Sequence, residues 1–319
     1  MTNHLVRLIT LVALFLATIT ASAQYPNKSI KIIVVLPAGT ASDTVERILA
    51  ASMAPSLGQP VIVENRAGGE GTIAGAEVAR SLPDGYTLLF ATSSLVSAPA
   101  MRKAMPYDPV RDFSPISLIG RYSTFLYASA ASPFKSLQEL IDYARAHPGK
   151  LNYASGNMGG IVSMAQVLAL ANLNMVHVPY KGEPAAVIDL ISNRVQVMFA
   201  TPTTTDAYVK EGKLRMLATT MPQRNPRAPD VPTMAEAGLP KFAIVVWAAM
   251  YGPAKMPPGV VDRLWREVNL ALSHPEVKEK LERQQFFAQG STPKELEAYT
   301  REQLYVYART LRDAGVQPE

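Results

Sequence analysis

No cysteine occurs among the 319 residues of the chain. Disulfide bonds, thiolate metal ligands and a cysteine nucleophile are therefore excluded, and so is a lipid anchor attached through cysteine. Histidine is also scarce, with four residues. His147 and His274 each precede a proline at a predicted helix end, and His177 alternates with valines in a predicted strand. We expect no metal and no cofactor.

The chain also lacks the short motifs that carry catalysis. Neither the two-histidine zinc-protease motif nor the glycine-flanked serine of a nucleophile elbow occurs. The loop at 68–71 is rich in glycine, but Lys and Ser/Thr do not stand at the positions of a phosphate-binding Walker loop. The sequence thus presents no nucleophile–base pair, and we predict no catalytic residue.

Membrane-length apolar runs and basic clusters are missing too. Arg7 precedes an uncharged run over 8–19 and the sequence Ala21-Ser22-Ala23. The run is shorter than the roughly 20 residues that span a bilayer, and its flanks are typical of a signal peptide. We expect cleavage after Ala23 and export to the periplasm. The net charge of +5 comes without a Lys/Arg cluster, so nucleic acid is not an expected partner.

What is present is a repeated alternation of short apolar strands with helical patterns, which predicts an α/β fold with mostly parallel sheets flanked by helices. Two long apolar-aromatic runs, 115–129 and 242–251, are interpreted as strands that cross between two lobes. The expected organisation is a signal peptide at 1–23, a first lobe of 24–122 plus 244–319, and a second lobe of 123–243.

The most informative segment is 31–57. A run of apolar residues from Ile32 to Leu36 predicts a buried strand, a Pro-Gly turn follows, and a helical pattern begins. Asp43 with Glu46 three residues later fits a capping box. Such a turn aims free backbone N–H groups at an anion, although an ordinary strand–helix connection has the same pattern.

Small and hydroxylic residues follow four predicted strands, two in each lobe, at the edge where ligands bind in open α/β sheets. Backbone N–H groups and hydroxyls suit a carboxylate that is held by neutral dipoles. Ser155 and Asn157 have an alternative role as turn or cap residues. The predicted ligand-binding residues are Gly39, Thr40, Ala41, Ser42, Asp43, Thr92, Ser93, Ser155, Gly156, Asn157, Gly159, Gly160 and Thr201.

A set of longer motifs, in order, resembles the Bug family, the extracytoplasmic solute receptors of tripartite tricarboxylate transporters. The resemblance covers about 25–318. The matching segments are Tyr25-Pro26, Pro37-x-Gly39-x-x-x-Asp43, 58–66, 83–89, 106–113, 148–155, 178–182 and 230–238. It implies a two-lobed periplasmic binding protein of type II-like fold that closes on a small organic carboxylate, with transporter subunits or a sensor as partners. We expect a monomer.

Two departures from the family pattern concern the ligand. Thr40 stands where the family usually has a second glycine, and Ala200 stands where an Asp is frequent. Loss of that acid would make the pocket less suited to an amino group, which favours a plain organic acid. The alternative function is an exported α/β hydrolase or isomerase that acts on a small carboxylate or ester.

Overall fold

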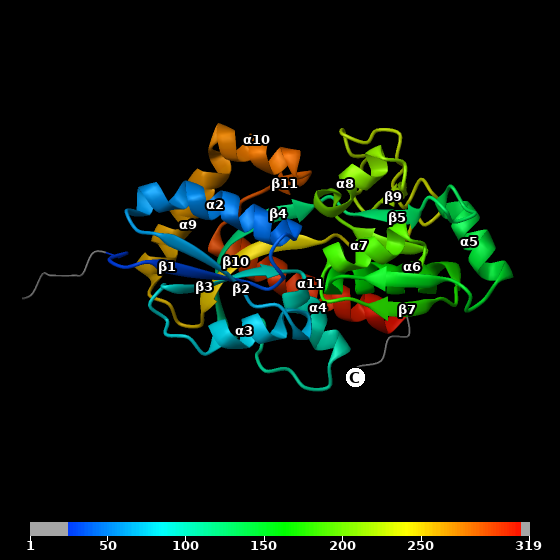
Figure 1. Ribbon diagram of the computed structural model, residues 1–319. Helices are drawn as coiled ribbons and strands as arrows, with labels where there is room; N and C mark the ends of the chain where they lie inside the picture. Colours follow the sequence, from blue (N-terminus) through cyan, green and yellow to red (C-terminus); the bar gives the residue numbers. More distant parts are fainter. Residues whose placement is uncertain (1–24, 314–319) are drawn as a thin grey trace, which may run out of the picture.

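The computed structural model describes residues 25–313, and the predicted signal peptide at 1–23 lies outside them. Two β-sheets, each flanked by helices, lie side by side along the long dimension of the molecule (Figure 1). The first sheet has the strand order β11-β4-β10-β3-β1-β2, and the second has the order β7-β6-β8-β5-β9. The predicted α/β architecture with two sheets is confirmed.

The strands of the first sheet are β1 (Ile30–Val34), β2 (Val61–Asn65), β3 (Thr87–Thr92), β4 (Phe113–Tyr122), β10 (Trp247–Pro253) and β11 (Phe286–Ala288). Those of the second are β5 (Phe125–Ser129), β6 (Asn152–Ser155), β7 (Val176–Pro179), β8 (Val197–Ala200) and β9 (Leu214–Thr219). The helices are α2 (Ala41–Leu57), α3 (Thr72–Ala79), α4 (Ser94–Met101), α5 (Leu137–Ala146), α6 (Met158–Ala171), α7 (Glu183–Ile191), α8 (Pro202–Lys210), α9 (Pro258–Ser273), α10 (Pro275–Arg283) and α11 (Pro293–Asp313), with a 3-10 turn, η1 (Gly69–Gly71).

The prediction of mostly parallel sheets is wrong, because both sheets are mixed. In the first, β1 is parallel to β2 and β3, whereas β10 is antiparallel to β3 and β4. In the second, β6 is parallel to β7 and β8, whereas β5 is antiparallel to β8 and β9. The reason is that β5 and β10 each follow a crossing and enter their sheet from the junction, opposite to strands that end there.

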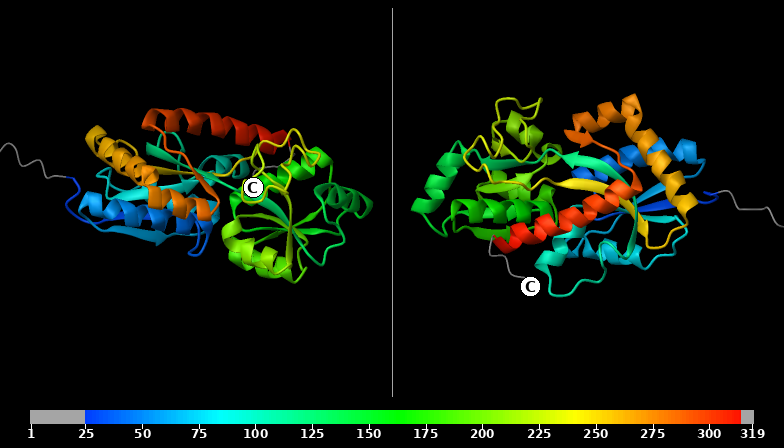
Figure 2. Two further views of the ribbon diagram at one scale, coloured as in Figure 1. Left: turned by 90° about the horizontal axis from the view of Figure 1, so that it is seen from above. Right: turned by 180° about the vertical axis from the view of Figure 1, so that it is seen from behind.

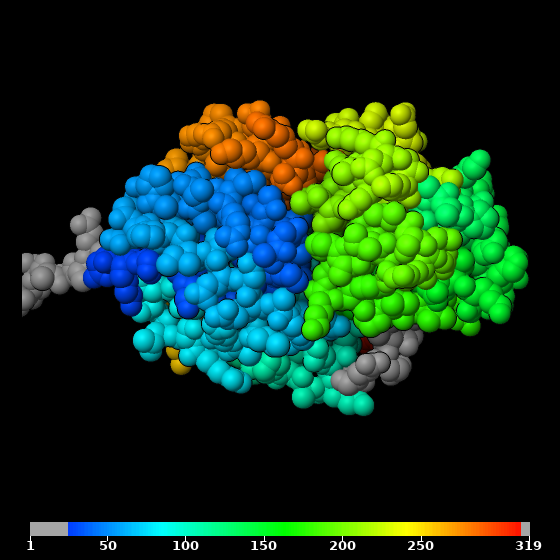
Figure 3. All heavy atoms as spheres, viewed as in Figure 1, coloured from blue at the N-terminus to red at the C-terminus, as the bar shows by residue number. Residues whose placement is uncertain are grey.

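The two crossings run next to each other. The chain passes from β4 to β5 through Ser123 and Thr124, and it returns into β10. Backbone hydrogen bonds tie the crossings to their neighbours, from the N–H of Tyr122 to the Val246 carbonyl and from the N–H of Thr220 to the Thr124 carbonyl, both 2.9 Å. The strand ends of both sheets therefore face one narrow junction, which Figure 3 shows as a seam between the blue-cyan and green halves.

The apolar core is continuous across this junction on one side. One buried cluster unites Met158 and Val162 of α6, in the second half, with Leu95 of α4 and with Leu296 and Tyr307 of α11. Figure 2 shows α11, in red, lying along the back of both halves. The C-terminal helix therefore joins the halves in addition to the two crossing strands.

Local sequence patterns determine several helix ends. From the sequence, Pro257-Pro258 predicts a helix over about 258–273, and Thr292 with Glu295 predicts a capping box; the structure has both, as α9 and at the start of α11. Ser136 caps α5 by accepting a hydrogen bond from the N–H of Glu139 at 3.1 Å. No helix among residues 25–313 is long and apolar enough to cross a membrane.

Glu46 is an exception to the apolar packing of α2. Its side chain is fully buried, and neither carboxyl oxygen has a hydrogen-bond partner among the described residues. Burial disfavours the charged form and raises the pKa of Glu46 well above its usual value. The folded protein therefore binds this proton at a pH where the unfolded chain has lost it.

We predict that Glu46→Gln is more stable than the parent at about pH 8 and that the difference disappears towards pH 4. Because the pKa of Glu46 is higher in the folded state than in the unfolded state, protonation of Glu46 contributes to the free energy of unfolding. This contribution is fully present below the unfolded-state pKa of about 4.3, and it is lost as the pH rises through the folded-state pKa. Urea unfolding at several pH values measures this. Glu302→Gln, at an exposed position, is the control; parallel pH profiles of Glu46→Gln and parent would contradict the assignment.

Candidate ligand-binding site

A small cavity of about 30 Å³ lies at the junction of the two sheets. By the usual measure this is room for about two water molecules, so the walls stand close together. Nine of the residues predicted for a ligand site line it: Thr40, Ala41, Ser42, Thr92, Gly156, Asn157, Gly159, Gly160 and Thr201. They come from both sheets, so the loops that the sequence analysis singled out do converge on one space.

Four predicted residues do not line this cavity. Gly39 and Asp43 bond to each other behind the first turn, where the Gly39 N–H donates to Asp43 Oδ2 at 3.1 Å. Ser93 is buried beside α4, and its N–H donates to the Trp247 carbonyl. Ser155 lines a neighbouring cavity of about 410 Å³. These residues support the wall of the small cavity from outside it.

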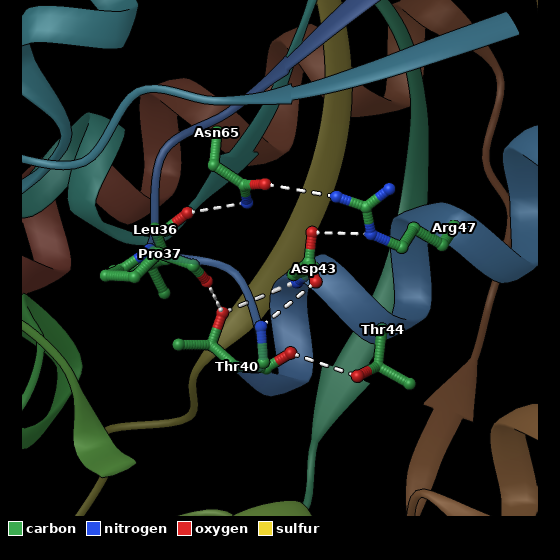
Figure 4. Close-up of polar contacts among 8 residues, drawn as sticks. Leu36, Pro37, Thr40, Asp43, Thr44, Arg47 and Asn65 are labelled. Atoms are coloured by element: carbon green, nitrogen blue, oxygen red, sulfur yellow. Dashed lines mark hydrogen bonds and ion pairs between the residues drawn. The ribbon is translucent and has the colours of Figure 1, made fainter. Parts of the chain in front are cut away.

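The first wall is the turn between β1 and α2, drawn in Figure 4. The helix begins at Ala41 with Thr40 as its N-cap, so the predicted capping box of Asp43 with Glu46 is wrong. Thr40 Oγ1 donates to the Pro37 carbonyl at 2.7 Å and accepts from the Asp43 N–H at 3.5 Å. Ala41 and Ser42 are the first two helical residues, whose N–H groups have no acceptor within a helix.

Asp43 serves this turn as an internal anion. Burial alone would raise the pKa of Asp43, but hydrogen bonds from the Arg47 guanidinium and the Gly39 N–H outweigh it and lower the pKa below the usual value. Arg47 Nε donates to Asp43 Oδ1 at 2.9 Å and Arg47 Nη2 to Asn65 Oδ1 at 3.2 Å. The carboxylate is thus paired, and Asp43 does not line the cavity.

The second wall is built around Glu183, the first residue of α7, whose side chain is 5% exposed. Its Oε2 accepts from the N–H and hydroxyl of Thr201 at 3.0 and 2.7 Å and from the Thr204 hydroxyl at 2.9 Å. Its Oε1 accepts from Asn157 Nδ2 at 2.8 Å. Burial raises the pKa of Glu183, and these four hydrogen bonds oppose the rise.

Six lining residues escaped the sequence analysis: Leu36, Tyr122, Thr124, Glu183, Phe199 and Val246. The hydroxyl groups of Tyr122 and Ser42 form a hydrogen bond of 2.9 Å, which links the end of β4 to α2. Thr124 is buried, and its Oγ1 has no partner among the described residues. No local pattern marks these positions, because strand 113–122 and helix 183–191 are brought together only by the tertiary fold.

Glu183 bears on the inference from Ala200. The missing acid after β8 was expected to make the pocket less suited to an amino group, but the cavity wall contains another acid, the Glu183 carboxyl group. Among the described residues that line the cavity there is no Lys, Arg or His. Residues 25–313 also contain no cluster of three potential metal-binding side chains. The site therefore combines backbone N–H groups, hydroxyls and one buried acid.

A serine–histidine contact lies next to this cavity and was not anticipated. Ser155 Oγ and His177 Nε2 are 2.6 Å apart, and the imidazole stacks on Tyr153. Ser155 belongs to the wall of the larger neighbouring cavity, whose cations are Arg102 and Lys181. A hydroxyl in hydrogen-bond contact with an imidazole is the first requirement for a serine nucleophile.

Comparison with known proteins gives consistent findings. The family described as tripartite tricarboxylate transporter family receptor matches residues 45–315. The chain is 32% identical to BugT of Bordetella pertussis over 98% of both proteins. It resembles the solved periplasmic binding protein BugD with a TM-score of 0.87 and 31% identity, covering 92% of this chain and all of that one. MatC of Rhodopseudomonas palustris, solved with bound malate, matches with a TM-score of 0.84 and 29% identity, covering 90% of this chain and all of that one.

We predict opposite effects for two glycine-to-alanine changes in the second wall. A Cβ at Gly156 would lie 2.3 Å from the Glu183 nitrogen and 2.6 Å from its Cα, so Gly156→Ala should lower the free energy of unfolding by about 1–3 kcal/mol. At Gly160 the nearest atom would be 3.5 Å away, and Gly160→Ala should be neutral or stabilise by about 0.5–1 kcal/mol. Thermal unfolding of both variants measures this, and equal losses would argue against the close approach of Gly156 to Glu183.

Proposed function

Because the chain belongs to the tripartite tricarboxylate transporter receptor family, we propose that it is an exported receptor that binds a small organic carboxylate between two lobes and presents it to membrane transporter subunits. The observation that carries the site assignment is the convergence of loops from both sheets on one cavity with free helix N–H groups. We infer that the signal peptide is removed after Ala23 and that a sensor is an alternative partner.

The carboxylate of the ligand is placed at the first turn of α2. The N–H groups of Ala41 and Ser42 and the hydroxyl of Ser42 provide neutral donors there, and the helix dipole favours an anion. Asp43 does not oppose this, because its charge is paired with Arg47 behind the turn. The lobes are 24–122 plus 244–319 and 123–243. A cavity of about 30 Å³ requires that they separate for entry.

A second candidate function is hydrolysis of a small ester in the neighbouring cavity, because Ser155 and His177 form a hydrogen-bonded pair. Membership in a family of solute-binding receptors argues against hydrolysis. We infer that the protein performs no chemistry on its ligand. Incubation with short-chain esters separates the two functions: turnover that Ser155→Ala abolishes would support hydrolysis, and recovery of unchanged ester supports the receptor.

We predict that Ala41→Val weakens carboxylate binding by roughly tenfold or more, equivalent to about 1.4 kcal/mol. Ala41 lines the cavity, and added methyl groups would crowd the N–H groups of the first turn. The cognate acid is first found by thermal shift with mono-, di- and aromatic carboxylates, since saturating ligand stabilises by about 2.7 kcal/mol at a hundredfold excess over Kd. Titration calorimetry then compares the variants.

The matched control for this change is Ala51→Val, which makes the same substitution at an exposed position of the same helix. Both variants carry the cost of a β-branched residue in α2. Equal affinities of Ala41→Val and Ala51→Val would remove the first turn of α2 from the binding site.

We also predict that saturating cognate carboxylate makes the protein more compact in small-angle scattering. A ligand that touches both walls stabilises the closed form in proportion to its preference for that form. Hydrogen bonds across the junction, from Thr203 to Gln284 and from Asn225 to Gln285, are available to the closed form. Superimposable scattering curves with and without ligand would rule out closure as the response to binding.

A further inference from the structure

We propose that the ligand of the small cavity is an ammonium-bearing carboxylate, whose carboxylate lies at the first turn of α2 and whose ammonium group bonds to Glu183. This deepens the proposed function and rests on it. It reverses the preference for a plain organic acid that the sequence analysis drew from Ala200.

The carboxyl group of Glu183 is surrounded by polar groups of the protein. The Thr201 N–H and the Asn157 Nδ2 amide, which can only donate, each bond to one of its two carboxyl oxygens, and the hydroxyls of Thr201 and Thr204 lie within hydrogen-bond distance of Oε2. The Asn157 amide is oriented, because its oxygen already accepts from the Gly160 N–H at 2.9 Å. An obligatory donor on each oxygen suits a carboxylate, which only accepts hydrogen bonds.

This carboxylate lies at the N-terminal ends of several helices. Asn157 is the N-cap of α6, Glu183 is the first residue of α7, and Thr201 is the N-cap of α8. The positive ends of three helices therefore surround the same two oxygens, and each favours a negative charge. In this wall the place that suits an anion is occupied by a side chain of the protein itself.

The side-chain donors of this wall are already used within the protein. The donors of Thr201 and Asn157 that were expected to hold a carboxylate in this wall are directed at Glu183. Arg102 and Lys181 border the neighbouring cavity, not this one. A second carboxylate at this end would thus meet a buried anion without a counter-cation, which is strongly unfavourable in a desolvated site.

The two ends of the cavity are therefore opposite in polarity. The α2 end presents N–H groups, and the other end presents Glu183, whose Oε1 accepts a single hydrogen bond from the protein. A carboxylate oxygen has room for a further donor. An ammonium group supplies both that donor and the missing positive charge, so a compact zwitterion such as an amino acid satisfies both ends at once.

Matched acids test this on the unaltered protein. Calorimetric titration compares aspartate with succinate and alanine with propionate, which differ in the amino group, and includes malate and lactate, which carry a hydroxyl in its place. We expect the amino acid of at least one pair to bind tenfold or more tightly than its deaminated and hydroxy analogues. Binding of a deaminated or hydroxy analogue as tightly as the amino acid in both pairs would overturn the proposal and leave the receptor function standing.

A charge-removing variant provides the second arm. Glu183→Gln keeps the side-chain volume and an oxygen acceptor, so we expect it to lose at least tenfold in affinity for the amino acid and to leave affinity for the deaminated acid unchanged or higher. Glu302→Gln, at an exposed position, is the control. Equal losses for both ligands would overturn the ammonium assignment. Failure of the parent to bind any carboxylate would instead overturn the proposed function, and this inference with it.

Discussion

The positive ends of four helices, α2, α6, α7 and α8, meet at one small cavity, and the rest of the site depends on how that charge is compensated. Each side of the junction has one internal carboxyl group, that of Asp43 in α2 and that of Glu183 in α7. Asp43 on the α2 side is paired with Arg47, whereas Glu183 on the other side is held only by neutral donors and helix ends. The walls therefore differ in polarity although both are made from strand–turn–helix connections. We therefore expect a ligand that bridges them to meet N–H donors at one end and the Glu183 carboxyl group at the other.

Most individual elements were accessible from the sequence because local patterns determine them. Thr292 and Glu295 satisfy each other's neighbouring N–H groups, and no distant residue is needed to start α11. The start of α2 was misplaced because Thr40-x-x-Asp43 and Asp43-x-x-Glu46 both fit a capping pattern. The choice between these two helix starts depends on how α2 packs in the fold, which buries Glu46 and places Thr40 at the N-cap. The directions of β5 and β10 were missed for a similar reason. Each of these strands is antiparallel to its neighbours because of the path that the chain takes between the two sheets, and no residue pattern within the strand indicates that path.

The candidate site was predictable to the extent that it follows strand ends. The turn at Thr40–Ser42 and the glycines at 159–160 line the cavity because loops at carboxyl ends of strands face the junction. Glu183 was not predictable, because before Pro184 it looks like an ordinary first residue of a helix. Its place depends on Gly156, which has no Cβ and so admits the Glu183 backbone, and on Thr201, which lies in another strand–helix connection.

The same junction also sets how the halves can move apart. On one side, Met158 and Val162 of α6 are buried against α4 and α11, and separating them would expose apolar surface to water. On another side the contacts are polar: Gln284 and Gln285 bond to Thr203, Asp206 and Asn225. Water replaces such hydrogen bonds at a net cost of only about 0.5–1.5 kcal/mol each. If the halves separate as proposed, the least costly route keeps the apolar contacts of α6 with α11 and breaks the polar contacts, so we expect the cavity to open on the side away from the C-terminal helix.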